Sequence, residues 1–294
     1  MTNKTPVAII GSGNIGTDLL LKIKKSKHLD CVAFIGRSAN STGIKFALEL
    51  KQNVFINGID FFLENPNSCK IVFDATSASS HKENNEIFKK LKIKVVDLTP
   101  ARIGSMCIPS VNINSIDNQS NVNMVTCGGQ ASIPVAFAIS QTHSAIDYIE
   151  VVSTISSRSA GPATRVNLDD YIHTTENAIK FFTKAKKVKA ILNLNPANPA
   201  ITMQTTIFAK VKQPNIKILK NFLNEIIVKI KKYVPGYEVI LGPLIENDRL
   251  VIMIRVVGLG DYLPSFAGNL DIINCAAINV AEYWAETKKN ENFN

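Results

Sequence analysis

Cys127 is the residue of this chain best placed for covalent chemistry. It stands in NMVTCGGQASIPVAFAIS (123–140), after a short apolar run that predicts a strand and before a long apolar run that predicts a helix. A thiol at a helix N-terminus lies at the positive end of the helix dipole, which lowers its pKa and populates the reactive thiolate. Gly128 and Gly129 leave backbone N–H groups unobstructed for an oxyanion, which forms when sulfur attacks a carbonyl. The pattern therefore predicts a cysteine nucleophile.

The other four cysteines are weaker candidates. Cys31 and Cys69 fall at the starts of predicted strands and Cys275 on the buried side of the last predicted helix, where free cysteines pack as small hydrophobes. Cys107 lies in a loop near predicted strand ends and is the competing nucleophile. The five cysteines contain no CxxC pair, so we expect reduced thiols in a cytoplasmic protein and no metal site. None of the four histidines has a spacing that marks a general base.

A glycine-rich loop, GSGNIG (11–16), follows an apolar strand predicted over 7–10 and opens an amphipathic helix. In a GxGxxG loop of this kind the first glycine permits a tight turn, the second lets a pyrophosphate approach, and the third lets the helix pack against the sheet. The helix N-terminus offers free N–H groups to the phosphates. With a nicotinamide near the Cys127 thiolate, one reaction is natural. The thiolate adds to an aldehyde, the thiohemiacetal gives up a hydride, and a thioester remains on the enzyme.

Strands alternate with helices in the first half of the chain, which predicts an α/β fold with a Rossmann-type, doubly wound parallel sheet. After Cys127, runs of strands with fewer helices predict an α+β second domain with a mixed or antiparallel sheet. A long amphipathic pattern over 267–289 predicts a C-terminal helix that returns to the first domain. We therefore expect a dinucleotide-binding domain over 1–130 and 268–294, and a catalytic and oligomerisation domain over 131–267.

The individual elements follow from the same periodicities. Strands are predicted over 7–10, 31–36, 71–79, 94–99, 148–157, 188–194, 202–211, 237–245 and 250–258, and further helices over 42–52, 81–92 and 215–233.

Composition excludes several classes of function. No apolar segment is long enough to cross a membrane, and the N-terminus lacks the apolar core of a signal peptide. The net charge of +9 comes mainly from lysines in short runs such as KIKKSK and KAKKVK, where helices present solvated faces. Because aromatic residues are not interleaved with these lysines, we expect no nucleic-acid partner.

Several stretches, above all VTCGGQA and SAGPATR with VFDATSASSH, VDLTPARIG and YLPSFAGNLDI, resemble the acylating acetaldehyde dehydrogenase family over about residues 5–285. The resemblance implies conversion of a short-chain aldehyde (acetaldehyde, possibly propanal), NAD and coenzyme A to acyl-CoA and NADH, with the acyl thioester on Cys127. It also implies a homo-oligomer and a 4-hydroxy-2-oxovalerate aldolase partner. The cofactor-binding residues that it implies are Ser12, Gly13, Asn14, Ile15, Ser159, Ala160, Gly161, Pro162, Ala163, Thr164, Arg165, Val166, Asn167 and Asn269.

Three features depart from the family pattern. Where the family has an acidic residue for the ribose 2′-hydroxyl, this chain has Arg37 and Ser38, which resemble a 2′-phosphate site and predict that NADP is accepted. The family's acidic residue in the second domain corresponds to Thr205. The segment between Tyr237 and Leu263 is shorter than in the family, which bears on the aldolase partner.

Two other functions remain open on the residues alone. A phosphorylating semialdehyde dehydrogenase, or acyl-phosphate reductase, would use the same sheet, cysteine and hydride with phosphate as the acyl acceptor. Such enzymes pair the cysteine with a histidine and a substrate-binding arginine, and no such pair is evident here. A redox-responsive regulator that senses NAD(P) would bind the cofactor without turning over an aldehyde.

Overall fold

The structure, a computed structural model, describes residues 4–161, 165 and 167–291. The chain divides into two compact units, the first being Met1–Met124 with Asn274–Asn294 and the second Val125–Ile273. The boundary between the units lies after Met124, before the predicted domain boundary at residue 130, and Cys127 therefore belongs to the second unit.

A seven-stranded sheet forms the centre of the first unit. Its strands are β1 (Thr5–Ile10), β2 (Leu29–Ile35), β3 (Val54–Phe55), β4 (Ile71–Asp74), β5 (Lys94–Asp97), β6 (Ser105–Met106) and β7 (Asn121–Asn123). Their order is β3-β2-β1-β4-β5-β7-β6, and every neighbouring pair is parallel, which confirms the predicted doubly wound sheet. The strand order reverses at β1, between β2 and β4. Ligands of such sheets bind outside the carboxyl ends of the strands at this point.

Helices complete the first unit. They are α1 (Asn14–Lys25), α2 (Thr42–Glu49), α3 (Asp60–Glu64), α4 (Ala78–Lys90), α5 (Pro109–Asn112), the short 3₁₀ helix η1 (Ile113–Ser115) and the C-terminal part of α10 (Gly268–Glu291). The buried indole of Trp284 on α10 donates to the carbonyl oxygen of Ile116 at 3.2 Å, and the Asn274 amide donates to Asp18 at 2.8 Å. The predicted return of the last helix to the first domain is confirmed.

β4 is shorter than predicted and ends at Asp74, ahead of the predicted end at Ser79. The Asp74 carboxylate accepts a hydrogen bond from the N–H of Thr76 at 3.0 Å, and the Ser77 hydroxyl caps α4 by accepting from the N–H of Ser80 at 3.2 Å. The small polar residues that extend the pattern therefore form the turn and the helix cap, where side-chain oxygens replace the missing backbone partners.

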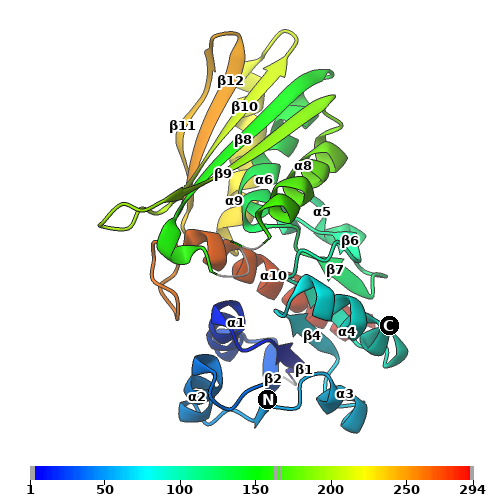
Figure 1. The fold of residues 1–294 in the computed structure, drawn as a ribbon. Coiled ribbons are helices and arrows are strands. Elements are labelled where there is room, and N and C mark those ends of the chain that lie inside the picture. Colours follow the sequence, from blue (N-terminus) through cyan, green and yellow to red (C-terminus); the bar gives the residue numbers. More distant parts are fainter. Residues whose placement is uncertain (1–3, 162–164, 166, 292–294) are drawn as a thin grey trace. The chain divides into compact units, whose positions relative to one another are not determined.

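The second unit has a five-stranded sheet covered on one face by helices (Figure 1). Its elements are α6 (Cys127–Thr142), β8 (Ile146–Ser156), the 3₁₀ helix η2 (Ser157–Ser159), α8 (Leu168–Thr183), β9 (Lys187–Asn195), β10 (Met203–Val211), α9 (Ile216–Lys231), β11 (Tyr237–Glu246) and β12 (Arg249–Val256). The order is β11-β12-β10-β8-β9, antiparallel except for the parallel pair β8–β9, so the sheet is mixed as predicted.

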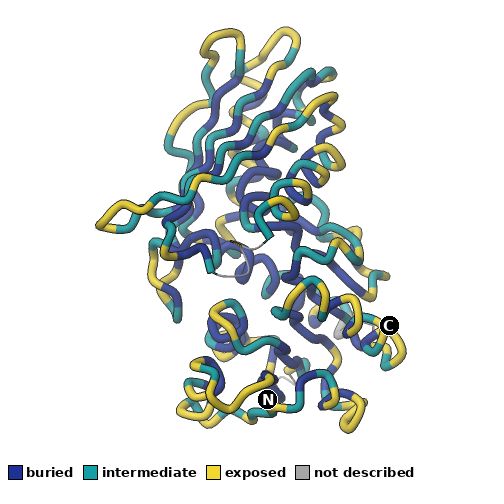
Figure 2. Tube along the Cα trace, viewed as in Figure 1, coloured by how far each residue is buried: buried dark blue, intermediate teal, exposed yellow. Residues whose placement is uncertain are grey.

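Along most of β8 and β10, the central strands of this sheet, residues alternate between buried and partly exposed, and Figure 2 shows the burial along the chain. On β10, Thr205 and Ile207 are buried while Gln204 and Thr206 are partly exposed. Period-2 alternation of this kind places one face of the sheet against α6, α8 and α9. α6, the helix that begins at Cys127, is thus held in the core of the second unit.

Among the described helices, none combines the length and the apolar character needed to cross a membrane.

Candidate active site

The GxGxxG loop connects β1 to α1. Gly11 has a φ of 112°, and a Cβ at this position would overlap the carbonyl oxygen of Ala75. A Cβ on Gly13 would meet no atom within 4 Å, so this side of the loop is open. Gly13 is also the N-cap of α1 and supplies no side-chain acceptor to the first turn, which leaves N–H groups of Asn14 and Ile15 for an anion. The loop therefore fits a pyrophosphate.

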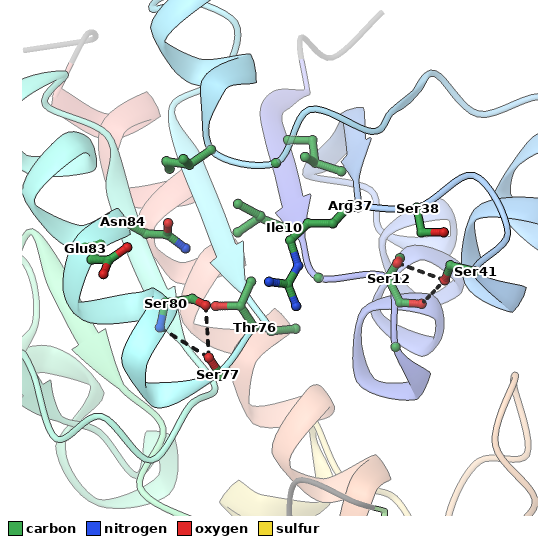
Figure 3. A pocket seen from close by; sticks show the side chains of 17 residues that line it. Ile10, Ser12, Arg37, Ser38, Ser41, Thr76, Ser77, Ser80, Glu83 and Asn84 are labelled. Atoms are coloured by element: carbon green, nitrogen blue, oxygen red, sulfur yellow. Dashed lines mark hydrogen bonds between the residues drawn. The ribbon is translucent and has the colours of Figure 1, made fainter.

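A cavity of about 560 Å³ lies beside this loop within the first unit (Figure 3). Ser12 and Gly13 line it from the loop, Ser41 from the start of α2, and Thr76 from the turn after β4. The Ser12 and Ser41 hydroxyl oxygens are 2.9 Å apart, and Ser41 also donates to the Ser12 carbonyl at 3.1 Å. The walls are thus rich in hydroxyl and backbone groups, as the polar parts of a dinucleotide require.

Arg37 lines the same cavity immediately after β2. Figure 3 shows its side chain extending into the cavity toward Thr76, with Ser38 and Ser41 on the side away from Thr76 and Glu83 of α4 beyond it. A guanidinium group and serine hydroxyls therefore occupy the place where an acidic residue would accept hydrogen bonds from a ribose.

A buried cluster of His81, Asp74 and Asp97 lies where β4 and β5 end, and sequence reasoning did not find it. The His81 ring lies between two carboxylates, with Nδ1 2.8 Å from Asp74 Oδ2 and Nε2 3.4 Å from Asp97 Oδ2. Burial lowers the pKa of His81, but its hydrogen bond to Asp74 and both carboxylate charges outweigh this effect and raise the pKa. Burial raises the pKa of Asp97 to about 6. In the sequence, the signal for this cluster was that two strands each end in an aspartate, Asp74 in β4 and Asp97 in β5.

Cys127 is the first residue of α6, and the predicted helix start is confirmed. Thr126 caps this helix by accepting a hydrogen bond from the N–H of Gly129 at 2.9 Å. The expectation that both glycine N–H groups are free was therefore wrong, because the Gly129 N–H is engaged by Thr126. The N–H groups that face the sulfur are those of Cys127 itself and Gly128.

The predicted lowering of the Cys127 pKa was also wrong for the free protein. Burial raises the pKa of this thiol, and the hydrogen bonds from Tyr171 and from two backbone N–H groups lower it by less. The helix N-terminus is present, but withdrawal of the sulfur from water outweighs it, because burial penalises the charged form. The thiol of the free protein is thus mostly protonated at neutral pH.

Sequence reasoning missed Tyr171, a residue of α8 whose side chain lies beside Cys127. Its hydroxyl oxygen is 3.6 Å from Cys127 Sγ. A Cβ on Gly128 would overlap the Tyr171 hydroxyl, so this glycine also makes room for the tyrosine. Burial raises the pKa of Tyr171 well above its ordinary value, and the phenol stays protonated. The only available signal was a tyrosine in NLDDYIHTT, one helical turn after Asn167.

Two further hydroxyls lie beside Gly128. Ser153 of β8 and Thr205 of β10 are both buried, with their hydroxyl oxygens 3.0 Å apart. A Cβ on Gly128 would lie 3.3 Å from Ser153 Oγ. The position that corresponds to the family's acidic residue is therefore part of a neutral hydroxyl pair near Cys127.

The rival cysteines are poorly suited to react. Cys107 is fully buried, and burial raises its pKa to about 12. Burial also raises the pKa of Cys31 and of Cys69 to about 12. Cys275 is buried too, which leaves Cys127 as the one partly exposed thiol of the five, all of which are described.

Two predicted cofactor segments meet within the second unit. The Asn269 amide donates to the carbonyl oxygen of Ser159 at 3.4 Å, and the buried Asn269 Oδ1 has no hydrogen-bond partner among the described residues. The Arg165 guanidinium donates to the carbonyl oxygens of Ala160 at 3.0 Å and Ser157 at 2.8 Å and so braces the segment.

The remaining predicted residues of this segment are placed as follows. Gly161 accepts from the N–H of Arg165 at 3.2 Å, and Asn167 is the N-cap of α8. The predicted contacts Pro162, Ala163, Thr164 and Val166 lie outside the described residues.

Family models match both parts of the chain. Residues 6–119 match the NAD binding domain of semialdehyde dehydrogenases, and residues 127–264 match the dimerisation region of prokaryotic acetaldehyde dehydrogenase. Solved structures of aspartate semialdehyde dehydrogenases share the fold. The Candida albicans enzyme with NADP has a TM-score of 0.68 at 15% identity, covering 96% of this chain and 98% of that one. The Vibrio cholerae enzyme has a TM-score of 0.61 at 12% identity, covering 96% and 97%.

Curated relatives resemble the chain over almost its whole length. The acetaldehyde dehydrogenase of Spirochaeta aurantia is 57% identical over 95% of this chain and 94% of its own. That of Pectobacterium atrosepticum is 54% identical over 96% and 97%, and that of Geobacillus stearothermophilus 44% identical over 97% and 98%. The chain therefore belongs to the acetaldehyde dehydrogenase family.

Proposed function

We propose that this protein oxidises a short-chain aldehyde, acetaldehyde or propanal, with NAD and passes the acyl group to coenzyme A. One observation carries the proposal. Of the five cysteines only Cys127 is partly exposed, and it begins a helix whose first N–H groups face its sulfur. The two family models that match, an NAD binding domain and an acetaldehyde dehydrogenase dimerisation region, both support this proposal.

Cys127 supplies the covalent step. Its sulfur attacks the aldehyde carbon, and the negative charge that develops on the aldehyde oxygen is stabilised by nearby N–H donors. After the hydride has left, the acyl group is held on sulfur as a thioester. The thiol of coenzyme A then attacks the acyl carbon, and Cys127 leaves as the thiolate.

The residues of the first unit fit the cofactor that the family implies. NAD, when bound, accepts the hydride. Ser12 and Gly13 line the cavity, and Asn14 and Ile15 supply the N–H groups of the first turn of α1 to the pyrophosphate. The unpartnered acceptor of Asn269 suits an amide donor, in keeping with the nicotinamide-side contact that the resemblance implies.

We extend the proposal to NADP, which we expect to be accepted unusually well for the family. Arg37 extends into the cavity that Ser38 and Ser41 also line, and a guanidinium group in a cavity with hydroxyl groups suits a 2′-phosphate. The repelling carboxylate of a strictly NAD-dependent site is replaced here by Arg37 and Ser38.

A steady-state assay tests the reaction. Acetaldehyde and propanal are each combined with NAD or NADP, with and without coenzyme A, and reduced cofactor is followed by its absorbance. We expect turnover to require coenzyme A. Turnover supported by inorganic phosphate instead would indicate an acyl-phosphate enzyme, and cofactor binding without any turnover would indicate a regulator.

We further propose that the second unit forms a homo-oligomer. The matched dimerisation region spans most of this unit, and Leu241 and Ile245 of β11 are 46% and 49% exposed. Light scattering coupled to gel filtration measures the oligomeric state. The aldolase partner and the cytoplasmic location stay predictions; co-elution with a 4-hydroxy-2-oxovalerate aldolase would test the partner.

A further inference from the structure

We propose that the hydroxyl of Tyr171 is a catalytic hydrogen-bond donor to the Cys127 thiolate, an inference that rests on the proposed role of Cys127 as nucleophile. The hydroxyl oxygen lies 3.6 Å from the sulfur, within reach of a sulfur hydrogen bond. It approaches from α8, whereas the sulfur lies on the first turn of α6, so tertiary packing creates the contact.

The thiolate needs such a donor because its surroundings are neutral. Burial is the main influence on the sulfur and disfavours its charged form. The groups that oppose this effect are Tyr171 and the N–H groups of Cys127 and Gly128. From the sheet, Ser153 and Thr205 bring only hydroxyls toward Gly128. Among the described residues, stabilisation of negative charge on the sulfur therefore falls to neutral dipoles, and Tyr171 is the side chain that contributes to it.

The Tyr171 hydroxyl has two neighbours within hydrogen-bond reach, the Thr126 hydroxyl and the Cys127 sulfur. Thr175 donates to the Tyr171 carbonyl oxygen at 2.8 Å. The Thr126 hydroxyl, 2.7 Å from that of Thr175, must then be the donor of that pair, while it accepts from the N–H of Gly129. Each hydroxyl has a single proton to give. The Thr126 oxygen already accepts from Gly129, so once Cys127 ionises the charged sulfur is the stronger acceptor within reach of the phenol.

Tyr171 acts as a donor and not as a base. Its phenol stays protonated, because burial raises its pKa well above the ordinary value. When Cys127 ionises, the S–H bond breaks and the proton passes to solvent water, because the residue as a whole is partly exposed although its sulfur is largely desolvated. The Tyr171 O–H bond stays intact and turns its hydrogen toward the sulfur. In the neutral thiol the sulfur donates to the phenol oxygen instead.

Alkylation of Cys127 tests this assignment. The folded protein is treated with iodoacetamide over a range of pH, and modification of the Cys127 peptide is followed by mass spectrometry. In Tyr171→Phe we expect the midpoint of the pH profile to rise by about one to two units, the size of one hydrogen bond to a charged group. Alkylation near neutral pH then slows about ten- to a hundred-fold. NADH formation should fall with it at neutral pH and recover at high pH.

Two variants accompany this one. Tyr148→Phe removes a phenol hydroxyl from β8 that bonds Glu150 at 2.7 Å, and it should leave the Cys127 profile unchanged. Gly128→Ala adds a methyl group that displaces the Tyr171 hydroxyl and should raise the midpoint as Tyr171→Phe does.

The outcomes separate this inference from the proposed function. If the midpoint stays unchanged or falls in Tyr171→Phe, Tyr171 is not the donor. A raised midpoint without the loss of NADH formation at neutral pH would overturn its catalytic role. Should Cys127→Ser keep full turnover, the proposed function itself fails, whatever the midpoint does.

Discussion

Replacement of Arg37 by aspartate should shift the cofactor selectivity of the first unit's cavity away from NADP and toward NAD. Arg37 extends into this cavity from the end of β2, and Ser38 and Ser41 line the same cavity. In Arg37→Asp the guanidinium partner of a 2′-phosphate is lost. A carboxylate also arrives, which accepts hydrogen bonds from a ribose 2′-hydroxyl and repels a phosphate.

The size of the effect follows from the contact. A charge-assisted Arg–phosphate hydrogen bond contributes about 1.5–3 kcal/mol, or roughly ten- to a hundred-fold in affinity. Arg37 is exposed, so solvent screening favours the lower end of this range for the loss of attraction alone. Added repulsion by the carboxylate brings the expected fall in the NADP-to-NAD ratio of kcat/KM to the order of a hundred-fold.

The assay compares kcat/KM for both cofactors in the wild type and in Arg37→Asp. Lys45→Asp is the matched control, because it makes the same change of charge at an exposed position of α2 that does not line the cavity. The reasoning is refuted if NADP is at least about a hundred-fold poorer in the wild type and Arg37→Asp leaves the ratio unchanged. Arg37 would then not contact the ribose.

Two further predictions concern buried polar groups. Thr205 stands where the resemblance implies an acid, so transfer of the acyl group to coenzyme A should be slow. Rapid mixing should then show a burst of NADH before a slower steady rate. Thr205→Asp should raise the steady rate, and Thr205→Asn should not. Absence of both the burst and the gain would assign that step to another group. The folded pKa values of Asp97 (about 6) and His81 are raised, so the folded protein holds protons that the unfolded chain releases. The contribution of Asp97 to stability is therefore lost as pH rises from about 4 through 6. The contribution of His81 is lost as pH rises through its raised pKa. Asp97→Asn should flatten this fall in urea titrations followed by Trp284, the single, buried tryptophan of the first unit, and an equally steep fall would contradict it.

The alternation of strands and helices was enough to predict the parallel sheet, because apolar runs and glycine signals are local in the sequence. The end of β4 was misplaced, since the small polar residues after Asp74 continue a strand-like pattern while their side chains cap the next helix. Local signals also predicted Cys127 as the nucleophile and the glycine loop as the phosphate site.

The partners of Cys127 were beyond the reach of local patterns. Tyr171 reaches the sulfur only because α8 packs against α6, and no spacing in the sequence records that contact. The direction of the Cys127 pKa was mispredicted for the same reason. A helix N-terminus is visible in the sequence, whereas the burial that outweighs it arises from tertiary packing.

The most direct test of the account is the site of the acyl group. The protein is mixed with acetaldehyde and NAD in the absence of coenzyme A, quenched in acid, digested, and analysed by mass spectrometry. The account predicts an acetyl thioester on the peptide that contains Cys127, in an amount equal to the NADH formed, and its removal by added coenzyme A. Formation of NADH with the acetyl group on Cys107, or with no acetylated cysteine at all, would contradict it.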